Sequence, residues 1–194
     1  MTCPGLPGSP LHAHLTLVGE DSSGPVAIVV EGKRDEPFGD RVGSLLRHAV
    51  RTGGAPGAEE VAERIHWLNA ALLPPLKEGL APLEDLRLRL LEGVAGALAH
   101  AGAMGAPRAV FLVHEVVELA KTSEARRRNN REDLDRFVRR LTGGSVERLQ
   151  RGVLAGPVKV PARGGGGAEW AGIQLLLGKV RWDLPSGGAA PGRP

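Results

Sequence analysis

The sequence predicts a small α/β domain with a mixed β-sheet. Along the chain, the patterns indicate an early hairpin, several helices, a strand, a further helix and a last strand. The length of 194 residues fits one domain, and 42% hydrophobic with 24% charged residues is typical of a soluble globular protein. We expect a disordered lead-in over residues 1–10, one domain over 11–183 and a disordered tail over 184–194.

The first two strands are predicted to form an antiparallel hairpin. The side chains of residues 11–18 would alternate between two faces, with Leu11, Ala13, Leu15 and Leu17 on one face and His12, His14, Thr16 and Val18 on the other. This pattern is typical of a half-buried strand. Residues 26–31 are a mainly apolar run, and the turn-rich segment 20–25 lies between the two. If that segment forms the loop, Gly19 faces Val26.

The remaining elements follow from the period of the apolar residues. Residues 108–114 predict a central strand covered on both faces, residues 173–182 a last strand, and residues 143–168 a loop. Asp40 is the expected N-cap of the first helix, and small residues such as Gly93 would let the third helix pack closely against the sheet. Helices are predicted over residues 40–51, 58–73, 83–104 and 132–141.

Charge and cysteine content narrow the class of protein. The formal net charge is +3, which permits a polyanionic partner without demanding one. Cys3 is the only cysteine, so an internal disulfide is excluded and a reducing, cytoplasmic setting is favoured. No apolar run has the length of a membrane span or of a signal peptide, so we expect no membrane association. A basic run precedes the helix predicted at 132–141 and contains Arg126, Arg127, Arg128 and Arg131. These arginines would contact the phosphates of a nucleic acid, or they form a solvated segment before the helix.

Glu31 and Lys33 end the second strand and are the candidate catalytic residues. Side chains alternate along a strand, so these two point to the same side, and Asp35 joins them if the extended backbone continues. A carboxylate and an ammonium in this place suit metal-assisted hydrolysis, with Glu31 holding the cation and Lys33 stabilising charge or orienting a water. The hairpin register places His14 opposite Glu31, where both could share one ion. The alternative is an ordinary charged strand end, since Glu-x-Lys occurs by chance in most proteins.

The extended motif over residues 30–39, Val-Glu-Gly-Lys-Arg-Asp-Glu-Pro-Phe-Gly, resembles a bacterial branch of the PD-(D/E)XK nuclease-like superfamily. Residues 86–91, 109–114 and 175–181 also look similar, so the resemblance runs from about residue 11 to residue 183. It implies a restriction-endonuclease-like fold and a metal-dependent nuclease that hydrolyses phosphodiester bonds. Glu31 and Lys33 would be catalytic, and the metal (magnesium or manganese) would lie on Glu31, His14 and Asp35.

Two departures from this superfamily bear on activity. His12 keeps the branch's histidine, but His14 stands where the branch has a metal-binding aspartate. Imidazole removes a charge and a hard oxygen donor, which favours zinc over magnesium, and Asp35 could partly compensate. The superfamily usually has an earlier helix that packs on the sheet, and we expect this helix to be missing here. The alternative function is therefore a catalytically inactive nuclease-fold module for binding or assembly, with an uncovered apolar surface that would suit a homo-oligomer or a protein partner.

Overall fold

The computed structural model describes residues 14–52, 57–118, 121–161 and 170–184. It confirms the predicted α/β class with a mixed sheet, whose strand order is β1-β2-β3-β5-β4. The strands are β1 (Leu15–Asp21), β2 (Gly24–Lys33), β3 (Arg108–Glu118), β4 (Ala155–Val158) and β5 (Gln174–Leu184). The helices are α1 (Val42–Arg51), α2 (Ala58–Leu72), the short η1 (Leu83–Asp85), α3 (Leu88–Met104) and α4 (Glu124–Leu141). The predicted lead-in, His12 and residues 185–194 of the predicted tail lie outside the described residues.

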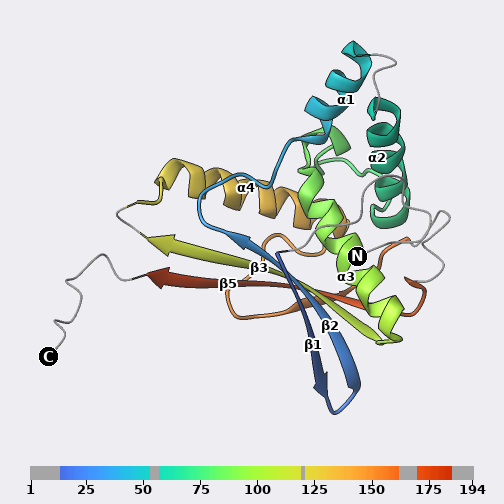
Figure 1. Cartoon of the computed structure of the whole chain (residues 1–194), viewed down its shortest axis with the longest axis vertical. Helices are drawn as coiled ribbons and strands as arrows, with labels where there is room; N and C mark the ends of the chain where they lie inside the picture. The colour runs from blue at the N-terminus through green and yellow to red at the C-terminus, as the bar shows by residue number, and fades with distance from the viewer. Residues whose placement is uncertain (1–13, 53–56, 119–120, 162–169, 185–194) are drawn as a thin grey trace, which may run out of the picture.

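Three parallel strands, β2, β3 and β5, form the centre of the sheet, and antiparallel β1 and β4 form its edges. Helices α1–α3 lie in the connection from β2 to β3, and α4 lies in the connection from β3 to β5. Both connections lead in the same direction across the sheet. Right-handed crossovers taken in one direction place their helices on the same side. Figure 1 shows the helices gathered on that one side of the sheet. Within the described residues the helices cover one face of residues 108–114. The prediction of burial on both faces holds at Val110, which points away from the helices and is 6% exposed, whereas Leu112 on the same side is half-buried.

The hairpin has the predicted register, because Gly19 pairs with Val26. The loop is shorter than expected, since the pairing continues to Asp21 and Gly24. The prediction of a half-buried first strand is wrong: Leu15 and Leu17 are 50% and 43% exposed. They lie at the sheet edge on the face away from the helices, so no helix of the described residues covers them.

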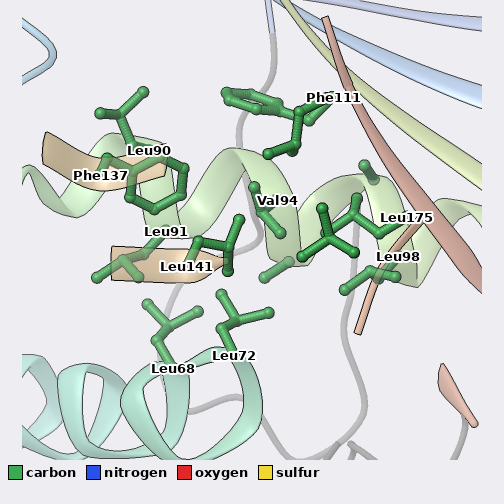
Figure 2. Close-up of a cluster of buried hydrophobic side chains, with 14 of the residues drawn as sticks. Leu68, Leu72, Leu90, Leu91, Val94, Leu98, Phe111, Phe137, Leu141 and Leu175 are labelled. Carbon is green, nitrogen blue, oxygen red and sulfur yellow. The ribbon is translucent and has the colours of Figure 1, made fainter. Parts of the chain in front are cut away.

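The main core lies between the sheet and the helices. Figure 2 shows side chains of α2, α3 and α4 meeting those of β3 and β5, with Leu68, Val94 and Phe137 among them. The predicted close approach of α3 to the sheet is confirmed, because a Cβ atom added to Gly93 would lie 2.3 Å from Cε2 of Phe111. Even a methyl group would not fit at residue 93, so a glycine at this position allows the short distance between α3 and β3.

Helix ends differ from the predictions where a local contact decides them. Helix α4 begins at Glu124, eight residues before the predicted start at 132, because the Ser123 side chain caps it by accepting a hydrogen bond from the Arg126 N–H at 3.4 Å. The arginine run is thus helical. Asp40 is not a cap: α1 starts at Val42 after Arg41, with no side-chain cap bond. The predicted helix 83–104 is interrupted between η1 and α3, where Arg87 forms an isolated bridge with Arg41.

The short edge strand β4 lies inside the predicted loop 143–168. It pairs with β5 at Ala155 and Val158, with an irregularity between them that contains Gly156 and Pro157. Proline cannot donate to a ladder, and this is why it is confined to edge strands and bulges. The same residue that argues against a strand in the sequence is compatible with this edge position.

The turn between β1 and β2 carries a pH-sensitive contact. Arg108, at the start of β3, donates hydrogen bonds to the Asp21 carboxylate and lowers its pKa from 3.8 to about 2. A lowered folded-state pKa gives stability that is complete above the unfolded pKa and is lost as the pH falls through the folded pKa. We therefore expect Asp21→Asn to destabilise the protein at pH 6, with the difference from wild type closing between about pH 4 and pH 2. Chemical denaturation across this range checks it, and a difference that stays constant with pH would contradict it.

Candidate functional site

Glu31 and Lys33 lie at the end of β2, on the face covered by the helices. Both are buried, with 2% and 5% of their surface exposed. The Lys33 Nζ atom lies 2.9 Å from Glu31 Oε1, so the two side chains share a side of the strand as predicted. A buried carboxylate without a cation would cost several kcal/mol, and the Lys33 side chain supplies the partner of opposite charge at Glu31.

A second cation also approaches the Glu31 carboxylate. The Arg89 Nε atom, from α3, lies 3.5 Å from Glu31 Oε1. Lys33 Nζ in turn donates to the Pro37 carbonyl oxygen at 3.4 Å and lies 5.2 Å from the centre of the Phe38 ring. Among the described residues, Oε1 receives no hydrogen bond of good geometry, so it is held by charge rather than by a directed bond. We call Glu31, Lys33, Arg89 and His14 the Glu31 centre.

His14 lies beside Glu31, as the hairpin register predicts. Its Nδ1 atom is 3.5 Å from Glu31 Oε2 and accepts a hydrogen bond from the Gly32 N–H at 2.9 Å. A ring nitrogen that accepts a hydrogen bond offers its lone pair to the donor, so Nδ1 acts as the acceptor of this imidazole. The Nδ1 lone pair is thus engaged by the backbone, and Nε2 is the ring nitrogen left for a metal ion.

Asp35 lies apart from the Glu31 centre. Strand β2 ends at Lys33, so the side-chain alternation that would have aligned Asp35 with Glu31 is lost. The Asp35 carboxylate instead lies 3.7 Å from Arg126 of α4. Within the described residues, no three side chains of the types His, Cys, Asp and Glu gather where they could hold a metal ion. Glu31 and His14 alone do not fit a magnesium, manganese or zinc site, and the metal stays a prediction.

A pocket of about 190 Å³ adjoins Lys33 at the carboxyl ends of the three parallel strands. Helix α4 lies over this end of the sheet in Figure 1 and forms one of its walls. The lining has two carboxylates, Glu115 and Asp135, and eight cations. We call it the basic pocket, and its cations are Lys33, Arg34, Arg127, Arg131, Arg148, Arg151, Lys179 and Arg181.

Sequence reasoning missed the contribution of β5 to this pocket. Lys33, Glu115 and Arg181 are neighbours across β2, β3 and β5 in the observed register. Ends of adjacent parallel strands meet at one edge of a sheet, and this rule could have connected the charged residues that follow each apolar run. Arg148 and Arg151 gave no such signal, because they come from a segment predicted only as a loop.

Some cations of the basic pocket form ion pairs with carboxylates of the described residues, and others do not. Lys179 pairs with Glu115 at 2.7 Å, and Arg34 pairs with Glu118 at 2.9 Å. Burial raises the pKa of Asp135, against the lowering effect of Lys179, Arg148 and Arg131. Four arginines of the lining form no ion pair within 4.0 Å with any described residue: Arg127, Arg131, Arg148 and Arg151. The pocket therefore has positive charge that its own carboxylates leave unmatched.

The structure divides the four arginines predicted to contact nucleic acid. Arg127 and Arg131 are four residues apart, so they share a face of α4, and both line the basic pocket. Arg126 and Arg128 lie off this face: each is 66% exposed, and they lie 3.7 Å from Asp35 and 3.9 Å from Glu132. If α4 had been predicted to start at Glu124, the helical period would have separated Arg127 and Arg131 from Arg126 and Arg128.

Comparison with known proteins identifies the family. The family described as Domain of unknown function (DUF6946) matches residues 5–182. The chain belongs to this family. No curated protein and no solved structure matches it. Among the described helices, none is long and apolar enough to cross a bilayer. The family description carries no activity, so a functional proposal has to rest on the Glu31 centre and the basic pocket.

Proposed function

We propose that this protein is a nuclease-fold module that binds the phosphate backbone of a nucleic acid at the basic pocket. The observation that carries this proposal is the group of four lining arginines without an ion pair among the described residues. Guanidinium groups match phosphate oxygens with two parallel hydrogen bonds, and contacts of this kind fix a nucleic acid in place without reading its sequence. The restriction-endonuclease-like form of the sheet is part of the proposal and rests on the resemblance of the motif around Glu31.

The second candidate is the metal-dependent nuclease that the motif predicts. One observation favours it: Lys33 belongs to both the Glu31 centre and the basic pocket, so a phosphate held in the pocket would meet its ammonium group. A nucleic acid bound there would have Glu31 next to that ammonium. What the described residues lack is a third His, Cys, Asp or Glu side chain that would complete a metal site with Glu31 and His14, and for this reason the binding module is the first candidate.

Two double variants test the binding proposal. Arg127→Ala with Arg131→Ala removes two cations from the pocket, and Arg126→Ala with Arg128→Ala removes two from the exposed side of the same helix. We expect the first pair to weaken binding of a fluorescent 20-nucleotide DNA or RNA by about tenfold or more and to reduce the salt slope by about 2. The control pair should change the affinity by less than about threefold. Anisotropy titrations at several salt concentrations measure both effects.

Equal losses in the two pairs would place the contacts on the whole basic helix rather than in the pocket, and no binding by the wild type would refute the proposal. The nuclease candidate has its own readout. Incubation of the same nucleic acids with magnesium, manganese or zinc tests for cleavage, with wild type and Glu31→Ala compared. Cleavage that Glu31→Ala abolishes would establish the second candidate in place of the first.

A further inference from the structure

A second pocket, of about 770 Å³, lies beside the chain that follows α2 and is separate from the basic pocket in its lining residues. Its walls are mostly apolar and include Leu73, Pro74, Leu83 and Val160. A volume of this size is in the range of sites for small molecules, and apolar walls with few polar groups are their usual composition. We call it the Arg140 pocket, after the charged residue discussed next.

Arg140, in the last turn of α4, lines this pocket and is 4% exposed. Its Nη1 atom donates a hydrogen bond to the Pro74 carbonyl oxygen at 2.7 Å. Its Nε atom is buried and has no hydrogen-bond partner among the described residues. Within the described residues, the Pro74 carbonyl is therefore the polar group that hydrogen-bonds the positively charged Arg140 guanidinium.

No carboxylate of the described residues compensates this charge. Arg140 forms no ion pair within 4.0 Å in the described part of the chain, and Glu84, which lines the same pocket, does not reach it. Burial lowers the pKa of Arg140, and no acidic group opposes this effect. A buried guanidinium without a counter-ion is destabilising, so its presence in the lining of a pocket calls for an anion from outside the chain.

We propose that the Arg140 pocket binds a small molecule with a carboxylate group attached to an apolar body. The carboxylate would pair with the Arg140 guanidinium at the pocket wall, and the apolar body would lie against Leu73, Leu83 and Val160. Lys159 at the same pocket adds a second positive charge. The proposal does not depend on nucleic-acid binding, because none of these residues lines the basic pocket.

Octanoate and octanol are the two probes, because they share an apolar chain and differ in the charged group. We expect octanoate to bind wild-type protein in calorimetry and to raise its melting temperature, and octanol to bind at least about tenfold more weakly. Arg140→Met should remove the preference for octanoate. Its own melting temperature without ligand should equal or exceed that of the wild type, because the variant replaces an unmatched buried charge by an apolar chain of similar length. Arg139→Met removes the neighbouring half-buried arginine, which does not line the pocket and lies 3.2 Å from Glu147, and should leave octanoate binding unchanged.

Ala70→Phe provides an independent test, since Ala70 lines the pocket and a phenyl ring would occupy its space. This variant keeps the charge and should lose octanoate binding. Equal affinities of wild type for octanoate and octanol would overturn the proposal, as would octanoate binding that persists in both Arg140→Met and Ala70→Phe. An Arg140→Met protein that is clearly less stable than wild type would show that the charge is compensated within the chain, and this too would overturn it.

Discussion

Replacing Asp133 by alanine should lower the free energy of unfolding by about 3–5 kcal/mol, because it leaves three guanidinium groups without their common partner. Asp133, on α4, is 4% exposed. Its Oδ2 atom accepts a hydrogen bond from Arg87 at 2.7 Å, and its Oδ1 atom accepts from Arg136 at 2.8 Å and from Arg41 at 3.4 Å. These arginines precede α3, belong to α4 and precede α1, so one carboxylate connects three parts of the helical layer.

Urea denaturation of Asp133→Ala and of a matched variant measures this cost. Glu132→Ala is the control, because Glu132 is the next residue on α4 and its side chain is 58% exposed, with a single contact of 3.9 Å to Arg128. An exposed pair of this kind contributes little, so the control should change the free energy of unfolding by less than about 0.5 kcal/mol. Asp133→Asn keeps an acceptor oxygen but no charge, and should lie between the two. A loss below about 1 kcal/mol in Asp133→Ala would show that the arginines find other partners.

The hairpin register could be predicted from local rules, whereas the edge strand β4 could not, because it lies in a segment predicted as a loop. The alternation over residues 11–18 and the apolar run up to Glu31 predict the strands, and the turn between them predicts the pairing of Gly19 with Val26. The register in turn places His14 beside Glu31, at an Nδ1–Oε2 distance of 3.5 Å. The contact between Gly32 and His14 could not be predicted, since it depends on the ring orientation and not on the pattern of residue types.

The basic pocket could be predicted only in part, because its residues come from five separate segments of the chain. The arginine run was evident, but its division into pocket-facing and exposed residues required the true start of α4 at Glu124. Similarly, nothing in the residues around Arg140 predicts that it is buried without a carboxylate, since this depends on how α4 ends against Pro74. Helical and strand periods predict which side chains face inward, and tertiary packing decides which inward charges find a partner.

His14→Asp should give the protein a metal site that the described residues of the wild type do not form. The substitution places a second carboxylate opposite Glu31, where facing Cβ atoms are about 4.5–5.5 Å apart. It also removes the imidazole whose Nδ1 accepts from Gly32. Two carboxylates at this distance repel each other, so without metal we expect a lower melting temperature than in the wild type. Magnesium or manganese neutralises both charges and supplies the oxygen-ligated cation that such a pair prefers.

The measurement is the melting temperature with increasing magnesium for wild type, His14→Asp and His14→Asn. Ligand-linked stabilisation reaches about 2.7 kcal/mol at a concentration 100 times the dissociation constant, so a real site in His14→Asp gives a shift that grows with the logarithm of concentration. His14→Asn has nearly the same shape as the aspartate variant but no charge, and should show no such shift; adding Glu31→Ala to His14→Asp should abolish it. If the wild type already shows a shift that Glu31→Ala removes, the imidazole does not disable the site. If His14→Asp shows none, a single missing acid is not what separates this domain from a metal-dependent nuclease, and the binding function gains further support.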